Sequence, residues 1–283
     1  MIELKNISYV YSNNSPYETA ALSDVSLSIG EGEFVGVIGH TRSGKSTLVN
    51  IMGGIVKPTT GKVYIDGEDI TEMKSVTKKL GGKIGVVFQY PEYQLFEETV
   101  YKDIAFGPKN LGLDKNEVDK RVRDAAKMTN IKEELFDKSP FELSGGQKRR
   151  VAIAGILSMK PKMLILDEPA AGLDPKGREE ILGQIKALHT EHGITVILVS
   201  HSMDDVAEIC EKIIVMSGGK VLKYSNMDSV FKNSSDLKAN GLSVPEITEI
   251  MIKLKESGLP VRDDIFRMDD ALAEIISLIR EVD

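Results

Sequence analysis

The stretch Gly39-His40-Thr41-Arg42-Ser43-Gly44-Lys45-Ser46-Thr47 follows the apolar run Phe34–Ile38 and precedes the largely apolar run Leu48–Met52. It matches the pattern GxxxxGK[ST] in full, and its context is a strand, a glycine loop and the start of a helix. In that context successive backbone N–H groups form a concave nest for phosphate, and the positive end of the helix adds to it. The stretch therefore predicts a nucleotide-binding loop whose nine residues all lie near the ligand.

Two side chains of this loop have predicted roles. Lys45 is expected to reach the β- and γ-phosphates, and the hydroxyl of Ser46 is expected to coordinate Mg²⁺. ATP with Mg²⁺ is therefore the expected ligand pair.

Composition narrows the class of protein. The chain has 283 residues and a formal net charge of −7, which does not favour nucleic acid as a partner. Cys210 is the only cysteine, so neither a disulfide framework nor a thiolate metal cluster is expected. The start of the chain does not resemble a signal peptide, and the apolar runs are far shorter than the ~20 residues that span a bilayer. We expect a soluble protein that can dock on a membrane protein.

The order of strand-like and helix-like segments along the rest of the chain predicts an α/β fold. Residues 2–11 and 21–29 are expected to be antiparallel strands, and Gly30–Glu33 a hairpin turn before the strand of the loop. Apolar strands then alternate with helices, which favours a mixed, mostly parallel sheet with an antiparallel β edge. Beyond residue 226, apolar side chains recur at helical spacing and predict two amphipathic helices, through Ile247, Ile250, Met251 and Leu254 and through Leu272, Ile275, Ile276 and Ile279.

Polar residues at strand ends supply the second half of a phosphoryl-transfer site. The apolar strand Met163–Leu166 leads into Asp167 and Glu168. Asp167 is expected to hold Mg²⁺ opposite Ser46, and Glu168 to take a proton from the attacking water. A purely structural acidic pair is less favoured, because an unpaired buried carboxylate is costly. Gln89 follows another apolar run and offers an amide to Mg²⁺ and water, and His201 is a candidate partner for the γ-phosphate.

These motifs together resemble those of an ABC ATPase. The phosphate loop, Gln89, Leu143-Ser144-Gly145-Gly146-Gln147, Leu164–Glu168, Gly172-Leu173-Asp174 and His201 occur in the order of the Walker A, Q-loop, signature, Walker B, D-loop and switch motifs. The resemblance covers residues 1–225 and implies a P-loop ABC ATPase fold with a helical subdomain at about 90–160. Residues 226–283 are then expected to form a small C-terminal helical domain for dimerisation or packing.

The resemblance also implies roles that the residues alone do not show. Two such subunits hold two ATP molecules head to tail, and Ser144, Gly146 and Gln147 reach the γ-phosphate bound by the partner, with Asp174 of the D-loop nearby. Tyr11 is expected to stack on adenine, with Tyr9 and Tyr17 as alternatives and plain strand packing as a further one. Arg42 departs from the glycine that is common at its position. If its φ is positive, it costs on the order of 1 kcal/mol, and its effect on turnover is left open.

A closer resemblance is to the ATPase subunits of energy-coupling factor transporters, the cobalt and vitamin importer group. It rests on the stretches Gln89–Val100, Phe106–Asn110 and Glu168–Pro175 and on the helical tail. It implies ATP hydrolysis that powers uptake of a vitamin or transition-metal ion, from the cytoplasmic face of the membrane. The implied partners are a second ATPase subunit, identical or not, a transmembrane coupling protein and, indirectly, substrate-binding membrane proteins. The residues expected to line the groove for the coupling protein are Tyr90, Tyr93, Leu95 and Phe96.

Two other functions remain open on the sequence. One is a soluble ABC protein that acts on ribosomes or chromosomes. Such proteins usually carry two cassettes or a long coiled-coil insertion, whereas here roughly 100 residues separate Lys45 from Ser144 and one cassette fills the chain. The other is a regulatory subunit that binds ATP with little turnover, a possibility raised by Arg42.

Overall fold

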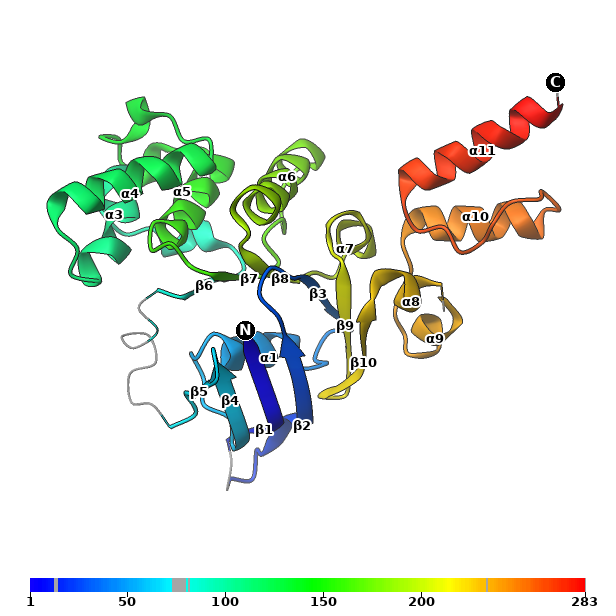
Figure 1. The fold of residues 1–283 in the computed structure, drawn as a ribbon, viewed down its shortest axis with the longest axis horizontal. Helices are drawn as coiled ribbons and strands as arrows, with labels where there is room; N and C mark the ends of the chain where they lie inside the picture. The colour runs from blue at the N-terminus through cyan, green and yellow to red at the C-terminus, as the bar shows by residue number, and fades with distance from the viewer. Residues whose placement is uncertain (13–14, 73–79, 81, 233, 283) are drawn as a thin grey trace.

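The computed structural model describes residues 1–12, 15–72, 80, 82–232 and 234–282, and its strands form two sheets (Figure 1). The first is antiparallel and has the order β2 (Thr19–Ile29), β1 (Ile2–Tyr11), β4 (Thr60–Ile65) and β5 (Glu68–Asp69). The second has the order β10 (Lys220–Asn226), β9 (Lys212–Ser217), β3 (Phe34–Gly39), β8 (Thr195–Val199), β7 (Met163–Asp167) and β6 (Ile84–Val87). Only its β9–β10 pair is antiparallel, so the expected mixed, mostly parallel sheet is confirmed.

The prediction of a hairpin turn at Gly30–Glu33 is wrong. Strand β2 pairs with β1, whereas β3 pairs in parallel with β8 and β9. The four residues therefore connect two sheets, and the antiparallel part of the fold is a sheet of its own. Sequence adjacency favoured a hairpin, but the apolar β3 is buried on both faces and takes the centre of the parallel sheet.

Strand β3 separates two hydrophobic cores. Its side chains alternate, so that Phe34 and Ile38 join one cluster while Val35 and Val37 join the other. The first cluster lies beneath helices α5 (Gly145–Leu157), α6 (Pro175–His192) and α7 (Met203–Ile209), and the second lies between the two sheets around helix α1 (Lys45–Met52). The loop between β3 and α1 is thus anchored from both sides.

Helices α3 (Val100–Asn110), α4 (Lys115–Met128) and α5 pack together at one end of the molecule (Figure 1). Short 3₁₀ turns precede and follow α3 and α4, namely η1 (Pro91–Gln94), η2 (Glu133–Leu135) and η3 (Pro140–Glu142). Because η1 contacts α5, the segment after Gln89 is fixed to the helix that follows the signature motif.

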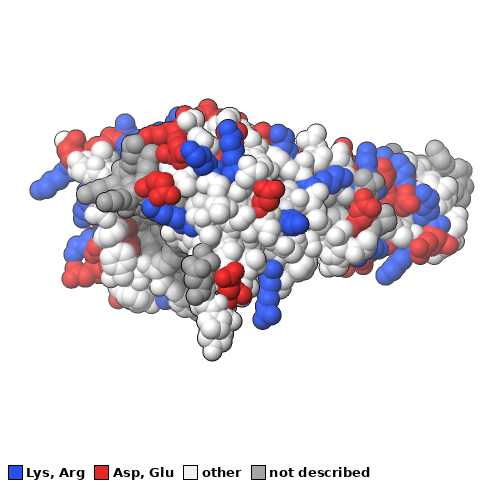
Figure 2. Space-filling view, turned by 90° about the horizontal axis from the view of Figure 1, so that it is seen from below, with Lys and Arg blue, Asp and Glu red and all other residues white. Residues whose placement is uncertain are grey.

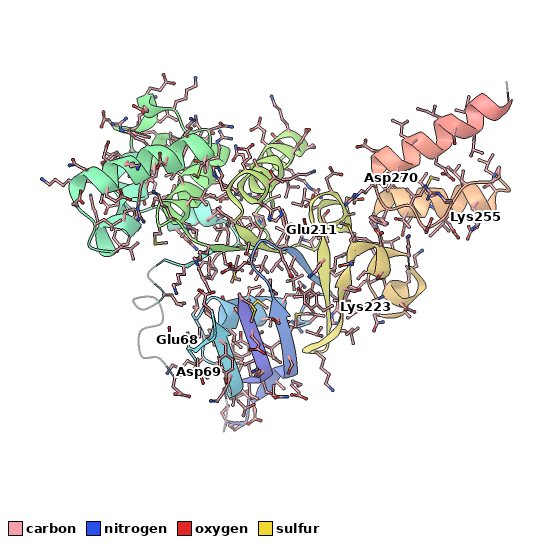
Figure 3. The ribbon with its side chains drawn as sticks, viewed as in Figure 1. Glu68, Asp69, Glu211, Lys223, Lys255 and Asp270 are labelled. Atoms are coloured by element: carbon pink, nitrogen blue, oxygen red, sulfur yellow. The ribbon has the colours of Figure 1, made fainter. Side chains whose placement is uncertain are left out.

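The last helices lie at the opposite end from α3–α5 (Figures 1 and 3). They are α8 (Met227–Phe231), α9 (Ser234–Ala239), α10 (Glu246–Glu256) and α11 (Met268–Val282). Figure 3 labels Lys255 on α10 and Asp270 on α11, the two predicted amphipathic helices, which bury a small core of their own. The side chains of Met268, Leu272, Ile276 and Ile279 remain exposed along α11.

Acidic and basic side chains are interspersed on the face drawn in Figure 2, and neither sign forms a continuous stripe there. The net charge of −7 is thus not concentrated on this face. Within the described residues, no helix has both the length and the apolar character needed to cross a bilayer.

Candidate functional site

The glycine-rich loop leaves β3 at Gly39 and enters α1 at Lys45. Gly44 caps α1 with a φ of 100°, and a Cβ at this position would lie 2.6 Å from the carbonyl oxygen of Ala21. Glycine is therefore required both by the backbone conformation and by the space. No side chain caps α1, so the N–H groups of its first turn are available to an anion.

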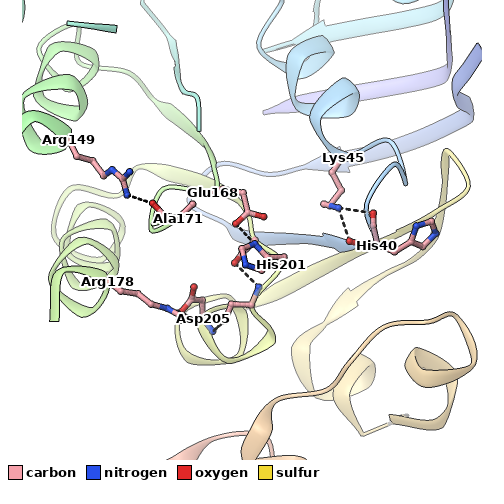
Figure 4. Close-up of polar contacts among 11 residues, drawn as sticks. His40, Lys45, Arg149, Glu168, Ala171, Arg178, His201 and Asp205 are labelled. Carbon is pink, nitrogen blue, oxygen red and sulfur yellow. Dashed lines mark hydrogen bonds and ion pairs between the residues drawn. The ribbon is translucent and has the colours of Figure 1, made fainter. Parts of the chain in front are cut away.

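Lys45 is folded back into its own loop. Its Nζ donates hydrogen bonds to the carbonyl oxygens of Gly39 at 2.7 Å and His40 at 3.0 Å (Figure 4). Burial lowers the pKa of Lys45, and the nearby carboxylates of Glu168 and Asp167 oppose that shift. The ammonium group thus lies between the loop and the acidic strand end, where a bound phosphate would be.

The fit of a phosphate to this loop has independent support from Ser43. Its Oγ is buried and has no hydrogen-bond partner among the described residues, which is costly unless a ligand supplies one. The backbone N–H of Ser43 donates to the carbonyl oxygen of His40 at 3.1 Å, which closes the loop. The imidazole of His40 donates from Nδ1 to the carbonyl oxygen of Thr41 at 2.8 Å.

Arg42 has a φ of 66°, the left-handed conformation that the sequence suggested as a possible cost. Its side chain is exposed and makes no hydrogen bond or ion pair within the described part of the chain. The structure therefore shows the strain, and it shows no compensating contact of the side chain among the described residues.

Asp167 ends β7 beside the loop. Burial raises its pKa, while a hydrogen bond from Ser46 and the charge of Lys45 oppose that rise. The pairing of Ser46 with Asp167 fits the donor set of Mg²⁺, which binds through one or two carboxylates and otherwise through water and phosphate. The described residues contain no cluster of three or more His, Cys, Asp or Glu that could hold a metal ion without ligands from water or phosphate.

Glu168 follows with a φ of 53°, a second strained residue at this edge of the sheet. Its Oε2 lies 2.7 Å from Nδ1 of His201 (Figure 4). Burial raises the pKa of Glu168, and the adjacent His201 opposes the rise. A carboxylate whose pKa is raised is a stronger base near neutral pH.

Gln89 lies with the Glu168–His201 pair. The side chains of all three line one cavity of about 260 Å³, together with Tyr90 and the loop that follows Glu168. The three residues predicted as catalytic are therefore brought together, although no hydrogen bond joins Gln89 to the other two within the described residues.

Tyr11 is attached to the helix of the loop. Its hydroxyl group lies 3.0 Å from Oγ1 of Thr47, and its ring is 45% exposed. The ring of Tyr9 packs edge-on against it with centroids 4.8 Å apart, whereas Tyr17 is 84% exposed. Of the three tyrosines considered from the sequence, Tyr11 is thus the one bonded to the phosphate loop.

The signature residues form a turn of their own. Ser144 caps α5 by accepting from the N–H of Gln147 at 3.3 Å, and the side chain of Gln147 accepts from the N–H of Ser144 at 3.0 Å. A Cβ at Gly146 would meet nothing within 4 Å, so this turn has open space above it. Asp174 caps α6 by accepting from the N–H of Gly177 at 2.7 Å.

Two ionic contacts near the site did not follow from the sequence, a buried one of Arg149 and a partly exposed one of Arg178. Arg149 pairs with Glu92 and also reaches the loop after Glu168. Arg178 donates from Nε to Oδ1 of Asp205 at 2.7 Å (Figure 4). Arg149 stands in the basic run Lys148-Arg149-Arg150, and no local pattern indicates which of these side chains is buried.

A larger cavity of about 1180 Å³ lies between the helical end and the core, and α3, α5 and the segment after Gln89 contribute to its walls. Of the four residues predicted to line a partner groove, Leu95 and Phe96 line it. Tyr90 lines the smaller cavity instead, and Tyr93, 83% exposed, lines neither. Phe96 and Phe106 form an edge-to-face pair there, with ring centroids 4.8 Å apart, and both remain exposed.

The fold and the site together define a P-loop ATPase of the ATP-binding cassette class. A family model described as "ABC transporter" matches residues 22–171. The chain belongs to this family and, within it, to the energy-coupling factor transporter ATP-binding proteins. It is 53% identical to the protein named EcfA2 of Caldanaerobacter subterraneus subsp. tengcongensis, over 99% of this chain and 98% of that protein. It is 52% identical to EcfA2 of Acetivibrio thermocellus, over 99% of each.

Solved structures agree with this assignment. A cbiO1 protein of Clostridium perfringens, described as part of the ABC transporter complex cbiONQ, is 40% identical with a TM-score of 0.75 and covers 89% of this chain and 98% of its own. A dimeric ATP-binding cassette in a post-hydrolysis state, bound to ADP and Pi, is 35% identical with a TM-score of 0.72, covering 80% and 99%. The predicted fold, family and ATPase activity are confirmed by these relationships.

Proposed function

We propose that this chain binds ATP on its phosphate loop, hydrolyses it with Glu168 as general base, and powers an energy-coupling factor importer for a vitamin or a transition-metal ion. One observation carries the proposal. Lys45, Asp167 and Glu168 lie within electrostatic reach of one another, whereas the signature turn of the same chain is open and, among the described residues, the side chains of Ser144 and Gln147 bond only within that turn.

ATP binding uses groups that are already in place. The free N–H groups at the start of α1 and the buried Oγ of Ser43 face the phosphates, and Lys45 exchanges its carbonyl partners for phosphate oxygens. Tyr11, held at Thr47, stacks on adenine. Ser46 and Asp167 would hold Mg²⁺, with Gln89 as a further oxygen donor, and the ion would neutralise phosphate charge.

Hydrolysis is an in-line displacement at the γ-phosphorus. Glu168 accepts a proton from water as the water oxygen attacks, the bond to the β-phosphate oxygen breaks, and ADP leaves with the electron pair. Burial supports this role because it raises the pKa of Glu168. In its doubly protonated form, His201 donates from Nδ1 to the carboxylate and from Nε2, which has no partner within the described residues, to a γ-phosphate oxygen.

The second half of each site comes from a second ATPase subunit, identical or not. Ser144, Gly146 and Gln147 occupy the exposed N-terminus of α5, which suits an anion delivered by another chain. Asp174 lies at a similar helix start and contributes to the same interface. Residues 226–283 form the C-terminal domain, and its α11, with exposed Met268, Leu272 and Ile279, adds to the dimer contact.

The membrane partner docks at the cavity beside Leu95 and Phe96, where an exposed aromatic pair is available. Interfaces are enriched in aromatic side chains, and Tyr93 lies exposed in the same segment. The chain thus works on the cytoplasmic face of the membrane, attached to a coupling protein, and substrate-binding membrane proteins contribute specificity indirectly. Nucleic acid has no part in this function.

A regulatory subunit that binds ATP with little turnover is a second candidate. The positive φ of Arg42 favours it, because the phosphate loop then carries an exposed guanidinium on a strained backbone.

The test is to purify the tagged chain from its host membranes in mild detergent and to measure ATPase activity of what is recovered. A polytopic membrane protein and a second ATPase should accompany it. The Glu168→Gln variant should recover the same partners and lose at least about 100-fold in kcat, the effect expected for a general base. Recovery of ribosomal or chromosomal proteins alone would overturn the importer proposal. Retained activity of Glu168→Gln would overturn the assignment of Glu168 as general base. Tight ATP binding by the wild-type complex with little hydrolysis would favour the regulatory subunit.

A further inference from the structure

The side chain of Arg149 is 2% exposed although it carries a permanent charge. It lies on α5, soon after the signature turn. Its Nε and Nη2 donate to the two carboxylate oxygens of Glu92, at 3.0 and 2.7 Å. Its Nη1 donates to the carbonyl oxygens of Pro169 and Ala171, both at 2.9 Å (Figure 4).

This environment is specific for a guanidinium group. Four of its five N–H groups have protein acceptors in these contacts. Burial of a charge is tolerated only when such partners are present, and the fork that matches a carboxylate cannot be reproduced by lysine. The site is thus built for arginine and for one orientation of it.

The two carbonyl contacts fall on the loop that begins at Glu168. A left-handed non-glycine residue persists only where its surroundings leave it no alternative. The N–H of Glu168 donates to the carbonyl oxygen of Val199 at 3.0 Å, and the N–H of Ala171 donates to the carbonyl oxygen of Glu168 at 3.1 Å. Arg149 fixes the carbonyl groups of the same loop from the opposite side, so it helps to hold Glu168 at its φ of 53°.

The carboxylate contact falls on the segment of Gln89. Glu92 belongs to η1, which begins after the left-handed Tyr90 and ends beside Leu95 at the 1180 Å³ cavity. The guanidinium group of Arg149, which lies on α5, therefore connects η1 to the loop that begins at Glu168. A displacement of η1 cannot leave the loop of Glu168 unchanged while these contacts persist.

We propose that Arg149 is a positioning residue for hydrolysis, which sets the place of Glu168 and links it, through Glu92, to the cavity beside Leu95. This inference rests on the proposed role of Glu168 as general base. Arg149 touches neither nucleotide nor water in this role, and it acts only through the loop that it holds.

The test compares Arg149→Lys and Glu92→Gln in the assembled membrane complex, by kcat and by KM for ATP. Lysine keeps the charge and loses the fork, and glutamine keeps the shape of Glu92 and loses its charge. We expect kcat to fall at least 10-fold in Arg149→Lys and severalfold in Glu92→Gln, with KM within 2-fold of wild type. A loss in kcat at an unchanged KM is the signature expected of a residue that positions the base and does not contact ATP.

Arg123→Lys is the matched control. Arg123 also contacts two carboxylates, Asp119 at 2.8 Å and Glu133 at 2.5 Å, but it lies on α4 and is 46% exposed. It should keep the wild-type kcat and KM.

The outcomes separate the two proposals. A wild-type kcat in folded Arg149→Lys, or in Glu92→Gln if the lysine variant does not fold, would overturn the positioning role. An inactive Glu168→Gln would then leave the base assignment standing. An active Glu168→Gln would overturn both.

Discussion

Arg42 and Glu168 are two non-glycine residues in the left-handed conformation at one nucleotide site, with φ of 66° and 53°. Their surroundings differ. The loop of Glu168 is bonded to Val199 and Arg149, and its carboxylate to His201. The side chain of Arg42 is exposed and makes no polar contact within the described residues.

The difference shows that strain at one site can have two origins. At Glu168 the surrounding network imposes the conformation and aims a functional carboxylate. At Arg42 the phosphate loop closes through its own main chain, since Lys45 and the N–H of Ser43 bond to carbonyl oxygens of the loop. The loop shape therefore fixes the φ of Arg42 whatever its side chain is.

The largest expected effect separates the buried arginine from the exposed one. Arg149→Met leaves the carboxylate of Glu92, whose side chain is 16% exposed, without its partner. The free energy of unfolding should therefore fall by up to about 3–5 kcal/mol, the range for broken buried pairs. Arg42→Met removes an exposed charge and should change the free energy of unfolding by less than about 0.5 kcal/mol. Urea denaturation of the two variants, followed by circular dichroism, gives both values. Equal losses would show that Arg42 has a contact as valuable as that of Arg149.

An intermediate effect concerns the charge of Glu168. Because burial raises its pKa, the folded state binds a proton more tightly than the unfolded state, so stability falls as pH rises from the ordinary value of 4.5 through the raised pKa. Glu168→Gln has no such charge and should be more stable than wild type at neutral pH. The gap should close below pH 4.5, where the carboxyl group is protonated in both states. Parallel stability curves for the two proteins would mean that ionised Glu168 costs the folded state nothing.

The sequence predicted the parts of this site that are local. The phosphate loop and the Asp167–Glu168 strand end could be placed because residue order, apolar runs and spacing are sufficient to bring each to a strand end. The connection at Gly30–Glu33 was misassigned because the pairing partner of β3 lies far along the chain. Arg149 was missed because its burial depends on Glu92, 57 residues earlier. The sequence could not show that Tyr90 lines a different cavity from Leu95 and Phe96, because its positive φ turns the segment after Gln89.

The smallest expected effect tests the origin of the strain at Arg42. Arg42→Gly removes a left-handed cost of about 1–2 kcal/mol but adds about 0.5–1 kcal/mol of backbone entropy to the unfolded chain, so a net gain of about 0.5–1 kcal/mol is expected. Arg42→Ala removes the same charge and retains the strain, and it should give no gain. Denaturation midpoints of the nucleotide-free protein measure both. If Arg42→Ala stabilises the protein as much as Arg42→Gly does, the cost at Arg42 comes from its charge beside the loop. Arg42 and Glu168 would then differ in electrostatics, and not in how their left-handed conformation is held.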